Sequence, residues 1–520
     1  VPRWMDHREA VSSRRSTARQ LNSNYTDGLS APTVDGPSVC AYHHMMGIND
    51  ISRRPATEQL DALRNRDISA TELLDEHLAR HDMLHSRLNA IVTTDVESAR
   101  HQAAEIDAAR NDDQTLGTLA GLPMTVKDAL ATAGMRSTGG AIELTDHVPS
   151  QDAASVAHAR NAGAVIWGKS NLPRWSGDIQ AVNEMFGRTG NPWDLGRTPG
   201  GSSGGAAAAV ATCLTPVEIG TDIGGSVRLP AHFSGVCGHK PSFGVVPQSG
   251  YIDHVTYGAL DADVNVIGPL ARTVDDLELM LDVISDHPER LPSTRQSARE
   301  LRVAAWLDDP ACPVSDDVAI VLEAAVSALE AAGVKVDRNA RPDHKFGDVY
   351  SIGMPLVSSA TSPGRTDEEY ERLLERSEDA DPTMAMRARA STIRHRDWLL
   401  MSEQRELRRR SWDRFFRNYD IVLAPTAFIA AFEHIDGGNL YTRTLEIDGA
   451  TRPYADLIAW TTQFGYVYLP ATVVPAGRTP SGLPVGLQIV GPFMGDRTTL
   501  EFARLVESVT GGYSAPPLLP

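Results

Sequence analysis

Glycine and serine are concentrated in one short part of this chain. Two turns rich in these residues, at 200–205 and 220–226, stand on either side of a run of small residues at 206–211. Because glycine has no Cβ, several backbone N–H groups can converge in such turns and face an anion. We therefore expect two tight loops around one helix of small side chains. The first turn taken alone is equally typical of a flexible linker.

Strand and helix patterns alternate along the first half of the chain. Apolar runs at 119–128 and 165–168 indicate buried strands, and the runs at 96–110 and 153–162 indicate helices. Segment 69–72 fits a capping box at the start of an earlier helix. This alternation predicts an α/β fold.

Other parts of the chain depart from this pattern. Residues 1–46 are rich in arginine, serine and threonine and have no sustained apolar period, which predicts a disordered tail or a start assigned too early. We expect residues 47–520 to form a single domain. Residues 365–417 are charged and helix-periodic, which predicts solvated helices over a substrate pocket. Apolar runs at 469–475 and 483–490 indicate two further strands.

The composition argues against several classes of protein. There are 67 acidic and 49 basic residues, a net charge of −18, whereas nucleic-acid binding requires a basic surface. The four cysteines include no C-x-x-C pair, so neither a zinc site nor a disulfide framework is expected. We find no apolar run of about 18 residues and no apolar signal segment, and we therefore expect a cytoplasmic protein without a membrane span.

Lysine is rare in this sequence. Of the 49 basic residues only five are lysine, which leaves 49 − 5 = 44 arginines. Arginine stays protonated, whereas lysine can lose its proton and act as a base. The five lysines therefore include candidates for a general base, a role that arginine cannot fill. They are Lys127, Lys169, Lys240, Lys335 and Lys345.

The second glycine turn has features that amide hydrolysis requires. This reaction needs a nucleophile, a base that takes its proton, and donors that stabilise the oxyanion. The N–H groups of residues 223–226 can form the donor nest, with Ser226 beside it. His232 and His239 are the histidines close in sequence, and both fit structural roles, so a Ser-His-Asp triad is not compelling. A lysine base is the other known arrangement.

The span from about 119 to 250 resembles the amidase signature family, which includes fatty-acid amide hydrolase, malonamidase, bacterial peptide amidases and the A subunit of glutamyl-tRNA amidotransferase. The spacings agree with the family: 202 − 127 = 75 and 226 − 202 = 24. The resemblance extends over roughly residues 50–515, and it implies a mixed β-sheet covered on both sides by helices. The matching segments are 121–128, 200–205, 220–228, 238–241 and 482–488.

The resemblance also implies a mechanism. Ser226 would be the nucleophile, and Ser202, after a cis peptide bond, would relay the proton to Lys127. The enzyme would cleave a small-molecule carboxamide into a carboxylate and ammonia or an amine through an acyl-enzyme, without a metal or organic cofactor. The oxyanion hole would consist of the N–H groups of Ile223, Gly224, Gly225 and Ser226. The residues that support the loop would be Ser203, Asp222 and Arg228.

Lys127 must be neutral to act as this base. Its neighbours Met124 and Val126 indicate a buried strand, and burial lowers the pKa of a lysine by disfavouring its charge. A surface lysine paired with Asp128 is the alternative interpretation. Whether the enzyme is a monomer or a homodimer is left open.

Two other functions compete with this interpretation. Residues 200–204 match the G-x-S-x-G elbow of α/β-hydrolase esterases, but the elbow needs a preceding strand and residues 191–199 resemble a loop. The glutaminase subunit of a tRNA amidotransferase would share the same motifs. Segments 172–180 and 365–417 are more similar to those of stand-alone bacterial amidases, which favours that assignment.

Overall fold

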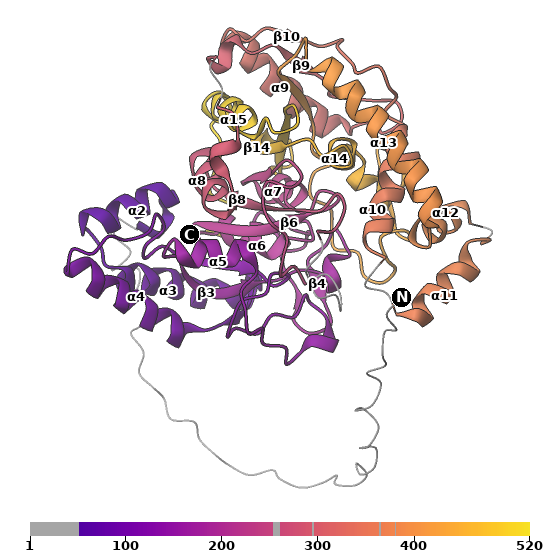
Figure 1. Cartoon of the computed structure of the whole chain (residues 1–520). Helices are drawn as coiled ribbons and strands as arrows, with labels where there is room; N and C mark the ends of the chain where they lie inside the picture. The colour runs from indigo at the N-terminus through magenta and orange to yellow at the C-terminus, as the bar shows by residue number, and fades with distance from the viewer. Residues whose placement is uncertain (1–50, 253–260, 294–295, 363–365, 380, 520) are drawn as a thin grey trace, which may run out of the picture. The chain divides into compact units, whose positions relative to one another are not determined.

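The computed structural model describes residues 51–252, 261–293, 296–362, 366–379 and 381–519 (Figure 1). The predicted tail at residues 1–46 lies outside the described residues. Ile51–Pro520 form one compact unit.

A mixed sheet forms the centre of this unit and contains 11 strands within the described residues. Parallel pairs join β3, β2 and β6 near one edge and β11, β9 and β10 at the other, and the strands between them are antiparallel. In sheet order the strands are β1 (Ile91–Thr94), β3 (Val165–Ser170), β2 (Pro123–Lys127), β6 (Val217–Asp222), β8 (Val266–Ala271), β7 (Cys237–Lys240), β14 (Ala471–Arg478), β15 (Pro484–Val490), β11 (Ile421–Pro425), β9 (Val303–Ala305) and β10 (Val336–Asp337).

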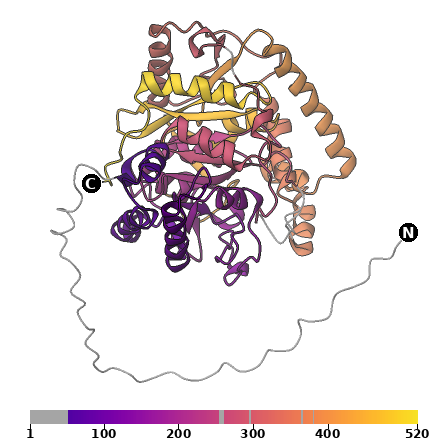
Figure 2. The ribbon, with the colours of Figure 1, turned by 60° about the vertical axis from the view of Figure 1, so that its left-hand side comes forward.

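Helices cover both faces of the sheet, as the side chains of β14 show. Successive residues of a strand point to opposite faces. Val473 packs in the cluster that contains the alanines of α6, whereas Val474 packs in the cluster of Leu322 and Phe502 from α9 and α15. The central strands are therefore buried on both faces, which explains why they are almost continuously apolar. Figure 2 shows α15, in yellow, along one face.

The helices begin and end close to where the sequence indicates. The helix predicted after segment 69–72 is α3, and Ser69 and Glu72 form the expected capping box. The helices are α2 (Ala56–Asn65), α3 (Ala70–Leu88), α4 (Val96–Asn111), α5 (Ala154–Asn161), α6 (Gly204–Ala211), α7 (Arg228–Ser234), α8 (Val274–Ile284), α9 (Asp316–Ala331), α10 (Met354–Ala360), α11 (Asp367–Arg376), α12 (Pro382–Ser391), α13 (His395–Phe415), α14 (Ala459–Gly465) and α15 (Asp496–Thr510). The predicted α/β fold and mixed sheet are confirmed.

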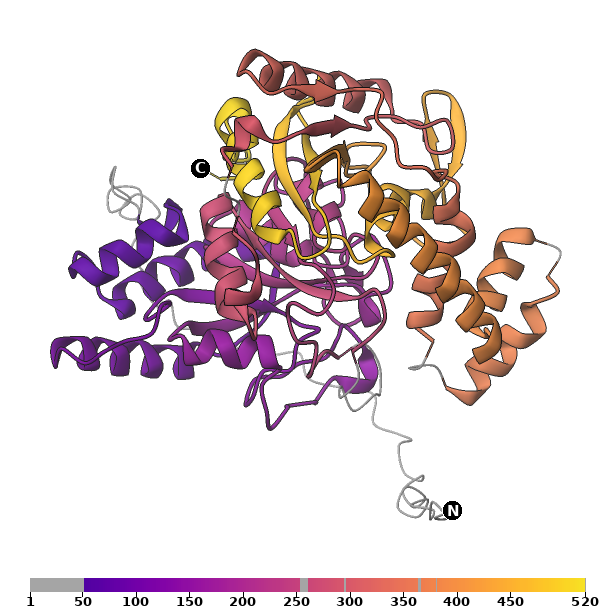
Figure 3. The ribbon, with the colours of Figure 1, turned by 45° about the horizontal axis from the view of Figure 1, so that its top comes forward.

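The charged segment 365–417 is helical, as predicted, and forms α11, α12 and α13, drawn in orange (Figure 3). It is not solvated along its whole length. Trp412 and Phe415 of α13 are buried in an aromatic cluster with Phe464 of α14, because the last two turns of α13 pack against the core. This end of the segment is therefore part of the core.

Candidate active site

Lys127 ends strand β2, and its side chain is completely buried. Its Nζ donates to Ser202 Oγ at 2.6 Å and to Thr221 Oγ1 at 2.7 Å. Burial lowers the pKa of Lys127 to about 7, and the carboxylates of Asp222 and Glu218 oppose this effect only in part. The amine can therefore lose its proton near neutral pH, which a general base requires.

The first glycine-serine loop brings two serines close to this amine. The Gly201–Ser202 peptide bond is cis. A Cβ on Gly201 would lie 2.6 Å from the carbonyl carbon of Ile179, so a larger residue would displace the loop. Ser203 binds the main chain of Thr221 twice: its hydroxyl donates to the Thr221 oxygen and accepts from the Thr221 nitrogen, each at 3.3 Å.

Ser226 lies in the turn between β6 and α7. The N–H of Ser203 donates to the Ser226 carbonyl at 3.2 Å, which joins the two serine loops directly. Ser226 is partly exposed, whereas Ser202 and Lys127 are buried. Among the described residues, no group hydrogen-bonds to the Ser226 hydroxyl. The turn therefore combines a partly exposed serine, whose hydroxyl has no partner among the described residues, with a backbone link to the loop of the buried lysine–serine pair.

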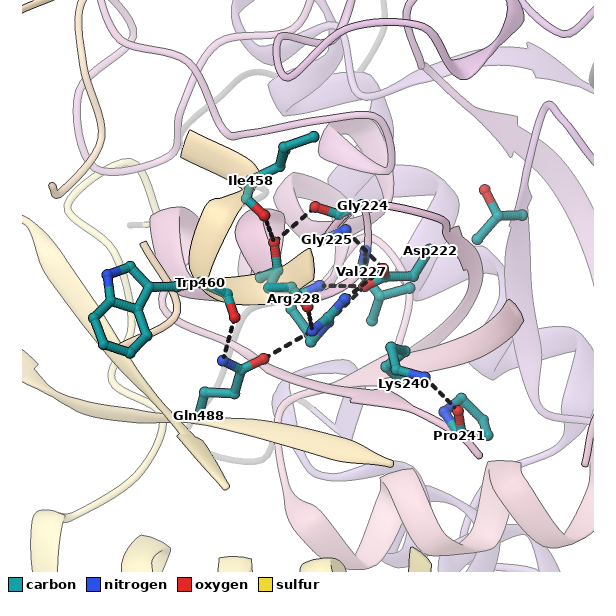
Figure 4. A network of polar contacts seen from close by, with 12 residues as sticks. Asp222, Gly224, Gly225, Val227, Arg228, Lys240, Pro241, Ile458, Trp460 and Gln488 are labelled. Atoms are coloured by element: carbon teal, nitrogen blue, oxygen red, sulfur yellow. Dashed lines mark hydrogen bonds and ion pairs between the residues drawn. The ribbon is translucent and has the colours of Figure 1, made fainter. Parts of the chain in front are cut away.

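The carboxylate of Asp222 organises the Ser226 turn (Figure 4). It accepts the N–H groups of Gly225 at 2.7 Å and Val227 at 3.2 Å. Nε and Nη2 of Arg228 donate to the same carboxylate at 2.9 and 2.8 Å, and both side chains are fully buried. Burial by itself raises the pKa of Asp222, but the charge and hydrogen bonds of Arg228 lower it to about 2, so Asp222 stays ionised.

Arg228 also connects this turn to the C-terminal part of the chain. Its Nη1 donates to the Thr461 carbonyl at 2.7 Å and to Gln488 Oε1 at 2.8 Å. The Thr461 hydroxyl donates to the Gly224 carbonyl at 2.7 Å. Helix α14 and strand β15 thus hold the turn from the opposite side, as Figure 4 shows.

Four backbone N–H groups, those of residues 223–226, are the predicted oxyanion donors. One of them, on Gly225, donates to Asp222 in this structure. Among the described residues, no group accepts a hydrogen bond from the N–H of Ile223, Gly224 or Ser226. These three N–H groups are therefore without a hydrogen-bond partner in that part of the chain.

The structure places Lys127 against Ser202 and joins the loop of Ser202 and Ser203 to the Ser226 turn, and two further partners were not predicted from the sequence. Thr221 binds Lys127 across 94 positions, and Thr461 binds Gly224 across 237 positions. Thr221 lies inside the matching segment 220–228, which is a signal that could have been used. Thr461 lies outside every matching segment, and no local pattern indicates its contact.

The two histidines have structural roles. Nδ1 of His232 accepts the N–H of Gly486 at 2.8 Å, its Nε2 contacts the Ile429 carbonyl at 3.0 Å, and burial lowers its pKa. His239 contacts Thr472 and Asp496. Neither histidine hydrogen-bonds to a serine of the site.

The esterase elbow does not match the observed geometry. Residues 191–199 form turns and no strand, so the strand that must precede a G-x-S-x-G nucleophile is missing. Ser202 is also fully buried and bound to Lys127. This alternative is therefore wrong, because both the backbone before the serine and its exposure differ from an elbow.

Comparison with known proteins agrees with the geometry. The sequence pattern of the Amidase family matches residues 72–500. The A subunit of glutamyl-tRNA(Gln) amidotransferase from Moorella thermoacetica is 31% identical over 495 residues, which cover 89% of this chain and 98% of that protein. A solved amidase superposes with a TM-score of 0.73 at 27% identity, covering 88% of this chain and all of that one. The structure of 6-aminohexanoate cyclic dimer hydrolase superposes with a TM-score of 0.71 at 26% identity, covering 91% of this chain and 100% of that one.

These matches show that the protein is a hydrolase that acts on C–N bonds. The chain belongs to the amidase signature family.

Two further observations concern cofactors and membranes. In the part of the chain that the structure describes, no group of three or more His, Cys, Asp or Glu side chains is arranged to hold a metal ion. The helices of that part also include none with the length and apolar character needed to span a bilayer.

Proposed function

We propose that this enzyme hydrolyses a linear carboxamide with Ser226 as nucleophile, Ser202 as proton relay and Lys127 as base. The observation that carries the proposal is the 2.6 Å contact between Lys127 Nζ and Ser202 Oγ in a fully buried site. Burial lowers the pKa of Lys127 to about 7, so its lone pair can accept the Ser202 proton near neutral pH.

The proposed reaction has two stages, which form and then hydrolyse an acyl-enzyme. Ser226 Oγ attacks the amide carbonyl carbon while its proton passes to Ser202 Oγ, and the Ser202 proton passes to Lys127 Nζ. The C–N bond then breaks, and the leaving nitrogen takes the proton back through the same relay. Water attacks the acyl-Ser226 ester along the same path and releases the carboxylic acid. Every proton removed from a nucleophile is returned to a leaving group, so Lys127 ends the cycle unchanged.

The charge that develops on the carbonyl oxygen requires fixed donors. The available N–H groups of Ile223, Gly224 and Ser226 support this role. Asp222 and Arg228 act on the backbone of the turn, since their hydrogen bonds end on Gly225, Val227 and the C-terminal segments. We assign them a positioning role.

A fluorophosphonate probe tests the nucleophile. Mass spectrometry of the labelled full chain should locate the adduct on Ser226, and Ser226→Ala should abolish both labelling and turnover. Ser285→Ala, at the end of α8, is the matched control and should leave both unchanged. An adduct on Ser202 or Ser203 would refute the assignment.

The helical segment 365–417 is our candidate for one wall of the substrate pocket. In α12, the Arg387 guanidinium lies 3.9 Å from the centre of the Tyr441 ring. Nearby, Arg443 Nη1 donates to Asp178 Oδ2 at 2.5 Å, and a Cβ on Gly201 would meet the Asp178 carbonyl at 2.8 Å. These contacts connect the segment to the Ser202 loop. A panel of benzamide, hexanamide and a dipeptide amide, read as ammonia release, should identify the acyl group.

A second candidate function is the glutaminase subunit of a tRNA amidotransferase. The 31% identity to such a subunit over nearly its whole length favours it. The two proposals differ in what the purified chain does alone. Turnover of the simple amides above without partner proteins supports the stand-alone amidase. Hydrolysis confined to glutamine and dependent on added amidotransferase subunits would support the subunit.

A further inference from the structure

The peptide between Gly224 and Gly225 is held at both of its ends. The Thr461 hydroxyl donates to the Gly224 oxygen at 2.7 Å, and the Gly225 nitrogen donates to Asp222 Oδ1 at 2.7 Å. The carbonyl and N–H of a trans peptide point in opposite directions. These two hydrogen bonds therefore define the plane of the peptide (Figure 4).

Two glycines in sequence make this restraint necessary. Neither residue has a Cβ that resists rotation of the peptide, and Gly225 has a φ of 121°. A flipped peptide would aim the Gly224 carbonyl oxygen at the ionised Asp222 carboxylate and would lose the bond from Thr461. Thr461 also lies directly against Gly225, because a Cβ there would be 2.5 Å from its Oγ1.

This peptide joins the two peptides that carry the Gly224 and Ser226 N–H groups. Holding its plane restricts ψ of Gly224 and φ of Gly225, the two rotations that set how these flanking peptides lie relative to each other. Thr461 itself is buried, and its carbonyl accepts from Arg228 Nη1 at 2.7 Å. We infer that Thr461 is a positioning residue for the oxyanion-stabilising turn, since its hydroxyl holds the Gly224–Gly225 peptide and so fixes the arrangement of the two flanking peptides whose N–H groups would face the substrate carbonyl. This inference rests on the proposed function.

Thr461→Val tests it, because valine keeps the shape and removes the hydroxyl. Thr461→Ser keeps the hydroxyl, and Thr461→Ala is the second variant should Thr461→Val not fold. Thr462→Val is the matched control: Thr462 is the next residue of α14, it is buried, and its hydroxyl has no hydrogen-bond partner among the described residues. Urea unfolding midpoints show whether each variant is folded.

The readouts are kcat and KM on benzamide or hexanamide, whichever is turned over faster, and the inhibition constant of the matching aldehyde, which adds to Ser226. Removing one direct oxyanion donor costs about 10²–10³ in kcat. For this indirect contact we expect a loss of about 10- to 100-fold in kcat, with KM changed less than about twofold. The aldehyde should bind more weakly by the same factor as the loss in kcat/KM. Thr461→Ser should retain most activity.

Other outcomes overturn the inference. A folded Thr461→Val or Thr461→Ala enzyme with wild-type kcat would contradict it. An equal loss of kcat in Thr462→Val would also contradict it, and so would a lower kcat in Thr461→Val with unchanged aldehyde binding. The failure of the proposed function looks different. In that case the wild-type chain is not labelled at Ser226, and both proposals fail together.

Discussion

Two buried ionisable sites lie side by side in this enzyme, and burial has opposite outcomes in them. Lys127 and the Asp222–Arg228 pair are all fully shielded from solvent. Burial lowers the pKa of Lys127 from 10.5 to about 7, and its two hydrogen-bond partners are hydroxyl groups without a charge. Asp222 contacts a guanidinium and backbone N–H groups, and its pKa is lowered to about 2.

The difference between the two sites shows that the contacts of a buried group determine whether it keeps its charge. A buried group keeps its charge when an opposite charge and hydrogen bonds replace water, and it tends to neutralise when they do not. Lys127 can therefore exchange a proton, which a base requires. The Asp222–Arg228 pair keeps its charge and holds the nucleophile turn in place. The predictions below change one site at a time, from the largest expected effect to the smallest.

Removing the exchangeable proton should have the largest effect. Arginine keeps the charge of Lys127 but does not lose its proton. Lys127→Arg and Lys127→Ala should therefore both lower kcat on the simple amides by about 10³-fold or more. In the wild type, kcat/KM should rise with pH through about 7, because the neutral amine is the active form.

Raising the pH should partly restore Lys127→Ala, since hydroxide can take the Ser226 proton. Lys335→Ala, at an exposed position, is the control and should leave the pH profile unchanged. Turnover of Lys127→Arg near the wild-type level would show that Lys127 acts only through its charge.

Breaking the charged pair should mainly affect stability and the turn. Arg228→Met leaves the Asp222 carboxylate buried without its partner, which costs about 3–5 kcal/mol in the free energy of unfolding. Urea denaturation should show this loss, and turnover should fall with it. The double variant Asp222→Asn/Arg228→Met should recover part of the stability but not the activity. Equal stability of Arg228→Met and the wild type would contradict the assigned role of the pair.

Features that depend on local sequence patterns are predicted, whereas contacts between distant parts of the chain are not. The capping box of α3 and the strands β2, β3, β14 and β15 depend on local patterns, and they were predicted. The Lys127, Ser202 and Ser226 assignment came from resemblance over short motifs. The contacts of Thr221 and Thr461 join residues 94 and 237 positions apart, so they depend on how the sheet assembles. The charged pattern of α13 predicts a solvated helix, and the burial of Trp412 and Phe415 depends on packing against α14, which no local pattern indicates.

The smallest predicted effect concerns stability and separates the two sites by pH. Between pH 7 and 10.5 the unfolded chain keeps the Lys127 proton, whereas the folded chain releases it. Stability rises with pH wherever the unfolded state binds more protons, so burial of Lys127 destabilises the protein fully below pH 7 and no longer above about 10.5. From pH 6 to 9 this group should add about 3 kcal/mol to the rise in the free energy of unfolding.

Lys127→Met removes this contribution and leaves the Asp222–Arg228 pair intact. Its free energy of unfolding, measured by urea titration at each pH, should therefore rise between pH 6 and 9 by about 3 kcal/mol less than that of the wild type. The other buried lysines titrate equally in both proteins and cancel in the difference. Lys335→Met, an exposed substitution, should follow the wild-type curve. Parallel curves for Lys127→Met and the wild type would mean that Lys127 keeps its proton in the folded protein, and the distinction between the two sites would then be lost.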